Sequence, residues 1–375
     1  MPANSNSLRI VHTEASLGWG GQEIRILTEA QGLIGRGHEV EIWAAPDSNI
    51  LPEAARRSIP SRTLPIGRKG LRGLFAMRRA LATVRPDIVN THSSTDTWLV
   101  ALARLTLRDP PPMVRTRHIS SPIPKNFPTR WLYTRATRHI VTAGERLRET
   151  LIRENRFPSV HMTSVPTGID TAQFCPGDRR EARQKLGLDP DARYIGIIAT
   201  LRSWKGHLYL LDAFARLAAG DDVLRLLIVG DGPMDTVIEK RIAELGLGRK
   251  IRLTGRQDDV SRWMQALDVF CLPSYANEGV PQAVLQAMLT GLPVVTTPVG
   301  SITEAVTHEV TGLLVPPRDD AALADAIRRL LTDAGLAKRL SDAARKEAIA
   351  RFGLDTMLDG MEKVFRSVAE HGRGN

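Results

Sequence analysis

The chain has 375 residues, so two domains of comparable size are expected, because one hydrophobic core rarely serves a chain of this length. Its composition (42% hydrophobic, 25% charged) is that of a globular enzyme, and it has neither a run of roughly 18 apolar residues nor an apolar signal segment after MPANSNS, so we expect it in the cytoplasm. The net charge of +10 falls within residues 1–170, where 24 Arg and Lys accompany 14 Asp and Glu, against 27 of each in the remainder. Two distant cysteines, Cys175 and Cys271, indicate neither a disulfide framework nor a zinc site.

Short apolar, β-branched runs alternate with helical stretches along the chain, which is typical of parallel sheets covered by helices on both faces. The first half contains the predicted strands LRIVHTEA, EVEIWAA, DIVNTH, MVRTRH, HIVTAG and HMTSVPTG. The second half repeats the pattern with YIGIIATL, LRLLIVGDG, IRLTGR, VFCLPS, PVVTTPV and GLLVPP. The sequence therefore predicts an α/β protein with two Rossmann-like, doubly wound parallel-sheet domains, whose ligands should bind in the turns that follow the strands.

The turn after the first predicted strand, SLGWGGQE, contains Gly20 and Gly21 ahead of a helix. Glycines let backbone N–H groups approach a ligand closely, and the start of a helix favours an anion. The spacing is not that of the GxGxxG dinucleotide fingerprint, and a glycine-rich turn can also serve only to relieve steric crowding.

A strongly basic region lies between residues 56 and 85, which hold nine basic residues and no acid. Within it, GLRGLFAMRRALATVRPD predicts an amphipathic helix with Leu71, Leu74, Phe75 and Leu81 close to one face. The cations on or just before this helix are Arg68, Lys69, Arg72, Arg78 and Arg79. A solvated face explains them as well as attraction to an anionic membrane or a phosphorylated acceptor does. No nucleic-acid motif accompanies them, so no nucleic-acid partner is expected.

The end of the fourth predicted strand, RTRHIS, carries His118 beside Arg115 and Arg117. Turns of this kind are where ligand-binding side chains lie in parallel sheets. A lone histidine is nevertheless more often structural than catalytic, and the same holds for His92 in NTHSS, so residue type alone leaves both explanations open.

Prolines and glycines between residues 166 and 177 interrupt regular structure between the two halves. We therefore expect domains at 1–170 and 171–355. The closing segment, 356–372, has apolar residues at helical spacing and predicts one long helix. This helix is expected to join the first domain, although its periodicity alone would fit packing within the second equally well.

The turn after the first strand of the second half, ATLRSWKGH, places Arg202 and Lys205 ahead of a helix. Two cations three residues apart suit a diphosphate better than a single phosphate, because each can neutralise part of a separate charge. A solvated turn is the simpler explanation of an isolated basic pair, but the neighbouring motifs favour the diphosphate.

The most informative motif is EGVPQAVLQAMLTGLPVV, residues 278–295, in which Pro281 suits the first turn of a helix of about ten residues that LTG ends. Glu278 precedes the positive end of this helix, and Gln286 lies on the same side, four residues after Gln282. The free amides can bind a charged group, the carboxylate can accept hydroxyl hydrogens, and the deeper amide side chain can bind ribose hydroxyls. Together they suit a nucleotide sugar.

Over essentially its whole length the chain resembles the retaining glycosyltransferases of family 4, which have the GT-B fold, with two Rossmann-like domains facing a deep cleft. The motifs that carry the resemblance are SLGWGGQE, RTRHIS, ATLRSWKGH, IVGDGP, EGVPQAVLQAMLTGLPVV and TGLLVPPRD. The resemblance implies a nucleotide sugar donor, expected to be a UDP-sugar, bound mainly by the second domain, and an acceptor held by the first. It implies no cofactor and no metal, and no DxD pair of acids ends a predicted strand.

The resemblance also implies roles for single residues, with Glu278 and His118 as the candidate catalytic pair. It assigns the donor diphosphate to Arg202 and Lys205, bordered by Gly20 and Gly21, the donor sugar to Glu278, Gly279, Val280 and Pro281, and the ribose or base to Gln286 and Arg256. The family pattern has a second glutamate at the position of Gln286. Because glutamine can also hydrogen-bond ribose, this departure predicts altered donor affinity rather than inactivity.

The expected function is metal-independent, retaining transfer of a sugar to a lipid-linked, lipopolysaccharide or surface-polysaccharide acceptor by a protein attached peripherally to the cytoplasmic membrane. Two other functions stay open. One is a nucleotide-sugar epimerase or hydrolase of the same fold. The other is a non-catalytic subunit that binds a sugar nucleotide, which the glutamine at position 286 allows.

Overall fold

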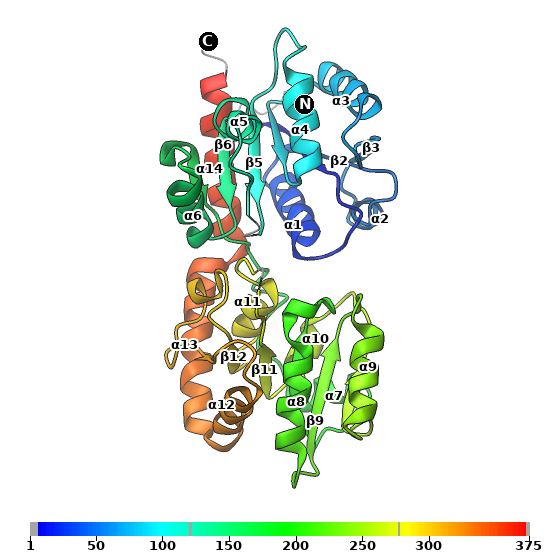
Figure 1. The fold of residues 1–375 in the computed structure, drawn as a ribbon, viewed down its shortest axis with the longest axis vertical. Helices are drawn as coiled ribbons and strands as arrows, with labels where there is room; N and C mark the ends of the chain where they lie inside the picture. Colours follow the sequence, from blue (N-terminus) through cyan, green and yellow to red (C-terminus); the bar gives the residue numbers. More distant parts are fainter. Residues whose placement is uncertain (1–6, 120–121, 277, 373–375) are drawn as a thin grey trace. The chain divides into compact units, whose positions relative to one another are not determined.

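The computed structural model describes residues 7–119, 122–276 and 278–372, which form two compact α/β units (Figure 1). The N-terminal unit runs to Gly168 and takes in the chain from Leu354 onward. The C-terminal unit is Ile169–Gly353. Each unit therefore has its own sheet and its own core, as the composition predicts for a chain of this length.

The N-terminal unit is built on a parallel sheet that has seven strands within the described residues, in the order β3-β2-β1-β4-β5-β6-β7. The strands are β1 Arg9–Glu14, β2 Glu39–Ala44, β3 Ser61–Thr63, β4 Ile88–Thr91, β5 Met113–Arg117, β6 His139–Thr142 and β7 Met162–Ser164. The helices are α1 Gly21–Gly35, α2 Ile50–Arg56, α3 Leu71–Val84, α4 Ser94–Arg104, α5 Phe127–Trp131, η1 Leu132–Ala136, α6 Glu145–Asn155, η2 Ser159–His161 and α14 Leu354–Gly372. The strand order reverses at β1 and β4, so ligands are expected beyond their carboxyl ends.

The C-terminal unit repeats this plan with a parallel sheet in the order β10-β9-β8-β11-β12-β13. The strands are β8 Arg193–Ile198, β9 Leu224–Val229, β10 Ile251–Leu253, β11 Val269–Leu272, β12 Val294–Thr296 and β13 Leu313–Leu314. The helices are α7 Arg179–Lys185, η3 Ser203–Lys205, α8 His207–Ala218, α9 Asp235–Glu244, α10 Ser261–Gln265, α11 Gln282–Leu289, η4 Ile302–Glu304, α12 Asp320–Thr332 and α13 Ala334–Phe352. Here the order reverses at β8 and β11, and the loops after these two strands are the expected ligand site.

The predicted α/β fold with two parallel sheets is confirmed, and every predicted apolar run contains a strand. A strand in the middle of a parallel sheet is buried on both faces and is therefore apolar almost throughout, as β11 is at all four positions. The strand that the sequence did not reveal, β3, lies at the edge of its sheet. Its sequence, SRT, contains no apolar residue, because an edge strand needs only backbone pairing, here with β2.

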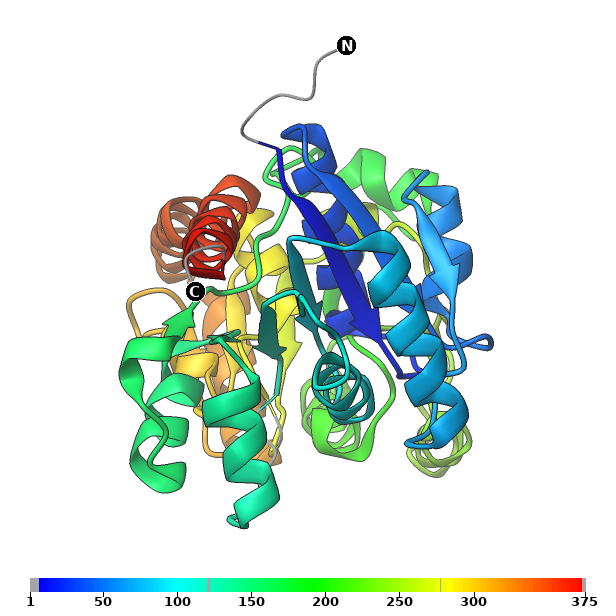
Figure 2. The ribbon, with the colours of Figure 1, turned by 90° about the horizontal axis from the view of Figure 1, so that it is seen from above.

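The long terminal helix expected from the periodicity is present as α14, red in Figures 1 and 2. It packs against α1, where a Cβ at Gly32 would lie 2.5 Å from Cδ1 of Leu358. Its apolar stripe, with Met361 and Phe365 fully buried, completes the core on one face of the N-terminal sheet. Within the described residues no helix combines the length and the apolar character that crossing a membrane requires.

The basic helix is present as α3, but the face expected to be apolar is only partly the buried face. Leu74 is half-buried, whereas Leu71 and Phe75 are 72% and 66% exposed. The buried residues of α3 are Gly73, Met77, Ala80 and Leu81. A Cβ at Gly73 would lie 2.8 Å from the Pro65 carbonyl oxygen, so this glycine lets the helix approach the preceding loop on that side. The approach turns Leu71 and Phe75 toward solvent.

Candidate functional site

The loops that follow β8 and β11 are joined by an ion pair. The Lys205 ammonium donates to both carboxylate oxygens of Glu278, at 2.7 Å and 3.0 Å. The Ser274 hydroxyl donates to the same carboxylate at 2.6 Å. Only 17% of the lysine side chain and 5% of the glutamate side chain are exposed. Two donors therefore fix the orientation of a buried carboxylate beside the point where the strand order reverses.

Two glycines allow these loops to come so close. Gly206 ends the Lys205 turn with a φ of 80°, and a Cβ there would lie 2.0 Å from the Pro273 carbonyl oxygen. Gly300 has a φ of 60°, and a Cβ there would lie 2.0 Å from the carbonyl oxygen of Glu278. Both positions need a left-handed backbone and no side chain, which only glycine supplies without strain. The contact between lysine and glutamate thus depends on these two glycines as well as on the charged residues.

Arg202 begins the same turn as Lys205 but is exposed. Its guanidinium lies over the indole of Trp204, 5.6 Å from the ring centroid. The backbone of Trp204 in turn accepts a hydrogen bond from the Tyr275 amide at 2.8 Å, which ties this turn to the loop after β11. The turn therefore presents one cation held by Glu278 and one cation open to solvent.

Helix α11 is present, but it begins one residue later than the sequence predicts, with Pro281 as the residue before its first turn and eight residues in the helix. The first N–H groups of a helix lack intrahelical acceptors and carry the positive end of the helix dipole. Gln282 and Gln286 are both half-buried on the side of α11 that does not pack into the core. Gly279 is half-buried and Val280 is buried in the loop between Glu278 and the helix. The four-residue spacing therefore sets both amide side chains on one side.

Arg256 is exposed in the loop after β10, a strand that β9 separates from β8. Its assignment to the base stays a prediction.

In the N-terminal unit, three histidines form a hydrogen-bonded chain. His92, after β4, bonds His118 through its Nδ1 at 2.9 Å and His12, in β1, through its Nε2 at 3.0 Å. The His12 ring lies 3.9 Å from the Glu29 carboxylate, which faces Arg25 at 3.7 Å. His118 is half-buried, whereas the groups behind it are fully buried. The candidate catalytic histidine is thus the outer end of an internal polar chain.

This chain is uncharged at neutral pH. Burial, reinforced by the Arg25 guanidinium, lowers the pKa of His12 to about 3. Burial also holds the pKa values of His92 and His118 well below their usual range, and neighbouring cations and rings act in the same direction. A neutral imidazole has one N–H and one acceptor nitrogen, so the tautomer of any ring in the chain fixes the tautomers of the other two.

The Gly20 and Gly21 loop, between β1 and α1, lies among carboxyl groups. The Glu14 side chain accepts hydrogen bonds from the Ser16 amide at 2.7 Å and from the side chain of Gln22. Burial, followed by the charge of Asp96, raises the pKa of Glu14 to about 8. Glu23, in the first turn of α1, is also buried. These acids favour sugar hydroxyl groups over a phosphate, so a diphosphate at this loop stays a prediction with less support than one at Lys205.

The structure places the candidate residues in two groups, one in each unit. Lys205, Glu278 and the start of α11 come together in the C-terminal unit. His118 and the glycine loop lie at carboxyl ends of strands in the N-terminal unit. The remaining candidates, Arg68, Lys69, Arg72, Arg78 and Arg79, lie on α3 or just before it. The residues that sequence reasoning missed are Ser274, Gly206, Gly300, His12 and, as the partner of His118, His92.

Two family models match the chain, Glycosyltransferase Family 4 over residues 19–173 and Glycosyl transferases group 1 over residues 178–347. A lipopolysaccharide core biosynthesis mannosyltransferase of Rhizobium meliloti is 33% identical over 189 residues, which are 48% of this chain and 54% of that protein. A D-inositol 3-phosphate glycosyltransferase of Kribbella flavida is 28% identical over 400 residues, covering 94% of this chain and 91% of that protein.

Solved structures share the fold. A glycosyltransferase from Rickettsia africae has a TM-score of 0.86 at 21% identity, over 97% of this chain and 99% of that one. HepE of Anabaena, in complex with UDP-glucose, has a TM-score of 0.84 at 22% identity, over 96% of this chain and 100% of that one.

Proposed function

The chain belongs to the group 1 glycosyltransferases of family-4 type and has the GT-B fold, and from this premise we propose that it transfers a hexose from a UDP-sugar, with retention, to a lipid-linked or surface-polysaccharide acceptor at the cytoplasmic membrane face. The pairing of Lys205 with Glu278 carries the proposal, because it sets a cation and a sugar-binding carboxylate at one edge of the sheet. HepE, with UDP-glucose, supports the donor. The Rhizobium relative, at 33% identity, supports a lipopolysaccharide-type acceptor.

The chemistry of transfer follows from the charges at the site. Breaking the bond between the anomeric carbon and the phosphate oxygen leaves negative charge on the diphosphate. Lys205, Arg202 and the positive end of α11 stabilise that charge, so a metal ion is not required. Glu278, oriented by Lys205 and Ser274, accepts hydrogen bonds from hydroxyls of the donor sugar. The acceptor hydroxyl attacks the face that the diphosphate leaves, and the departing phosphate oxygen takes the hydroxyl proton.

His118 has a different role from the cations. Because its pKa lies well below the usual range, the ring is neutral at pH 7 and does not stabilise charge. We propose that it hydrogen-bonds a sugar hydroxyl and that His92 orients it for that bond.

A donor panel tests the function. A thermal-shift assay with UDP-, GDP- and ADP-sugars identifies the donor, because a ligand at 100 times its Kd stabilises a protein by about 2.7 kcal/mol. Incubation with that donor alone then separates the alternatives. A transferase releases little free sugar without an acceptor, a hydrolase accumulates it, and an epimerase changes the sugar. A subunit that only binds gives no product with any acceptor, and the absence of any shift would refute the proposal.

Gln286 tests the departure from the family pattern. A carboxylate accepts hydrogen bonds that are roughly twice as strong as those of an amide, so Gln286→Glu should tighten binding of the donor ribose. We expect the donor KM to fall about fivefold, with kcat within about twofold of wild type. The control is Gln173→Glu, which adds the same charge at an exposed position of the same unit. An unchanged KM would remove Gln286 from the donor site.

The exposed face of α3 supports attachment to a membrane. Leu71 and Phe75 are exposed on the same side of α3 as Arg72, Arg78 and Arg79, so apolar side chains and cations are neighbours on this surface. Such a surface suits anionic lipid headgroups above hydrocarbon, and each cation near the membrane contributes about 1 kcal/mol.

Charge reversal tests this attachment. Glutamate at Arg72, Arg78 and Arg79 should weaken binding to phosphatidylserine-containing vesicles by at least about 100-fold in a flotation assay. The matched control reverses three exposed cations elsewhere, Arg153, Arg180 and Lys240. Equal binding of both triple variants would show that α3 does not dock on the membrane.

A further inference from the structure

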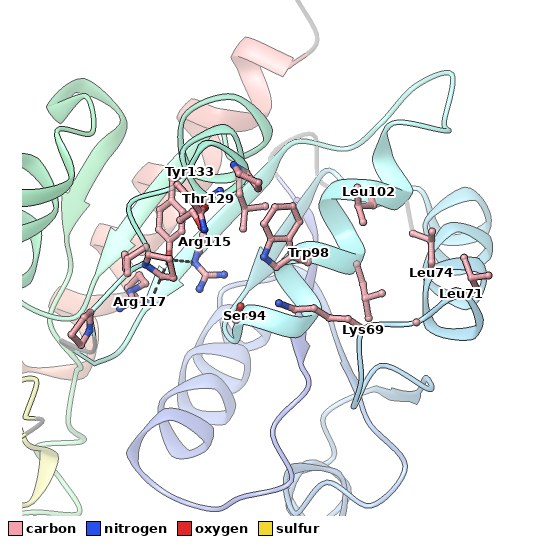
Figure 3. A pocket seen from close by; sticks show the side chains of 18 residues that line it. Lys69, Leu71, Leu74, Ser94, Trp98, Leu102, Arg115, Arg117, Thr129 and Tyr133 are labelled. Carbon is pink, nitrogen blue, oxygen red and sulfur yellow. Dashed lines mark hydrogen bonds between the residues drawn. The ribbon is translucent and has the colours of Figure 1, made fainter.

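A pocket of about 700 Å³ lies within the N-terminal unit, between α3, α4, the end of β5 and the α5–η1 segment (Figure 3). Its walls are mostly apolar and include Leu74, Trp98, Leu102, Ile123 and Leu132. The volume falls in the range of pockets that bind small organic ligands. The pocket lies on the face of the sheet that carries Val11, whereas His12, at the inner end of the histidine chain, is on the face of Ile10. Arg115, which lines the pocket, is close enough to lower the pKa values of His92 and His118.

One end of the pocket is cationic. Of the described residues that line it, three are basic (Lys69, Arg115 and Arg117) and none is acidic. In Figure 3, Lys69 and Arg115 extend toward Ser94 at the start of α4, whereas Leu71, Leu74 and Leu102 lie beyond Trp98. The Lys69 ammonium lies 5.8 Å from the centroid of the Trp98 ring. The pocket therefore has a charged end and an apolar end.

Arg115 is the unusual member of this set, because it is a cation that is only 3% exposed. Its guanidinium donates to the Ser93 carbonyl at 3.0 Å, to the Tyr133 hydroxyl at 3.1 Å and to the Thr97 hydroxyl, all of which are neutral. Within the described part of the chain no carboxylate forms an ion pair with it. Asp96, on α4, interacts electrostatically with Arg115, but its oxygens accept hydrogen bonds from Thr13, Ser93 and the His92 amide.

A buried guanidinium whose hydrogen-bond partners are all neutral destabilises the fold, and a bound anion would offset that cost. Guanidinium groups bind phosphate through two parallel hydrogen bonds, and Lys69 adds a second positive charge at the same end. Leu71, Leu74 and Leu102 at the apolar end have no side-chain hydrogen-bonding groups for sugar hydroxyls, so a hydrocarbon chain fits there better than a sugar. The combination fits one class of ligand, an anion with a hydrocarbon chain.

We propose that this pocket binds the lipid phosphate or lipid diphosphate part of a lipid-linked acceptor, with the phosphate at Arg115 and Lys69 and the hydrocarbon chain along Trp98, Leu74 and Leu102. This inference rests on the proposed transferase function and gives its acceptor a chemical class and a place. Leu71 and Leu102 are 72% and 40% exposed, so the apolar end of the pocket is open to solvent. The hydrocarbon chain of the ligand would leave the pocket there, toward the exposed face of α3. The phosphate end lies on the strand that leads directly into His118.

Alkyl monophosphates below their micelle concentration test the pocket without a membrane. By calorimetry, an alkyl phosphate should bind the full chain more tightly than inorganic phosphate and than the alcohol of the same length. Each added methylene should raise the affinity about fourfold until the apolar end is filled. Equal affinity for the alkyl phosphate and inorganic phosphate would overturn the proposal.

Two variants at accessible lining positions locate the site. Lys69→Gln should weaken binding of the alkyl phosphate about tenfold and leave the alcohol unaffected. Leu102→Gln should weaken the alkyl phosphate and flatten its dependence on chain length. The matched controls are Arg108→Gln and Leu105→Gln, which change exposed residues outside the pocket. If these controls weaken binding as much as the lining variants do, the probe binds elsewhere and the proposal is wrong.

The donor separates failure of this inference from failure of the proposed function. Neither lining variant should alter the thermal shift given by the nucleotide sugar, because Lys205 and Glu278 belong to the other unit. A chain that binds the nucleotide sugar but shows no preference for alkyl phosphates refutes the pocket alone. A chain that binds alkyl phosphates but no nucleotide sugar refutes the proposed function.

Discussion

Replacing Lys205 with methionine is expected to lower kcat by roughly 10²–10³-fold, because it removes a cation that stabilises the departing diphosphate and one such group contributes about 2.7–4 kcal/mol to the barrier. The substitution also removes the Lys205 ammonium from the buried Glu278 carboxylate, to which the Ser274 hydroxyl still donates. Breaking a buried pair in this way destabilises a fold by about 3–5 kcal/mol. Steady-state transfer assays and urea unfolding measure the two effects separately.

A double variant separates catalysis from stability. The double variant Lys205→Met with Glu278→Gln no longer has the buried carboxylate charge. Most of the free energy of unfolding that the single variant Lys205→Met loses should therefore return, while kcat stays low. Lys240→Met, which removes an exposed lysine of the same unit, is the control and should behave as wild type. Transfer at the wild-type rate by the single variant Lys205→Met would contradict the assignment of Lys205 to the diphosphate.

Acidification from pH 7 to pH 5 is expected to destabilise the N-terminal unit. Burial lowers the pKa of His12 to about 3 and keeps those of His92 and His118 well below the usual range, so these rings stay neutral when folded. Unfolded histidine titrates near pH 6.5. Below that pH the unfolded state binds more protons, and each buried ring removes about 1.4 kcal/mol of stability per pH unit.

Two buried carboxyl groups oppose this trend. Burial raises the pKa of Glu14 to about 8 and that of Glu29 to about 7. Between pH 4.5 and these values the folded state holds more protons than the unfolded state, so both groups favour the fold as the pH falls. Two further groups of this unit have shifted pKa values, because burial lowers the pKa of His139 to about 4 and raises the pKa of Asp96. The effects of four rings and three carboxyl groups largely cancel, so we expect the rings to prevail by roughly 1 kcal/mol.

Urea midpoints at pH 7 and pH 5 measure the net effect. The midpoint of the N-terminal unit should be lower at pH 5, and His92→Gln, which keeps a donor and an acceptor but does not titrate, should reduce the difference. The control is His161→Gln, an exposed histidine of the same unit. A midpoint that rises on acidification, or a His92→Gln variant with the same pH dependence as wild type, would contradict the assignment of neutral rings that oppose acidification.

The sheets were predictable from the sequence because burial on both faces demands continuous apolar runs. The failures have physical reasons. The edge strand β3 needs no apolar residue. Which face of α3 is buried depends on the close approach of the helix to the preceding loop at Gly73, and the spacing of apolar residues does not predict that approach. Sequence spacing treated Leu71 and Phe75 as part of an apolar face, whereas the structure leaves them in solvent.

At the site, the turn after each strand at the reversal point could be predicted, and Lys205 and Glu278 lie in those turns. Their contact could not, because it joins residues 73 positions apart through the left-handed glycines Gly206 and Gly300. The partnership of His92 with His118 likewise depends on the order of β1, β4 and β5 in the sheet. Strand order is a property of the folded chain.

Calorimetric titration with nucleoside mono- and diphosphates tests most directly whether the Lys205 turn binds a nucleotide sugar through its diphosphate. The nucleotides carry the base that the donor panel selects. We predict that the wild-type chain binds the nucleoside diphosphate at least about tenfold more tightly than the monophosphate. The double variant Lys205→Met with Glu278→Gln should lose this difference and keep its affinity for the monophosphate. Equal affinity of the wild-type chain for the two nucleotides, or a diphosphate advantage that survives in the double variant, would contradict it.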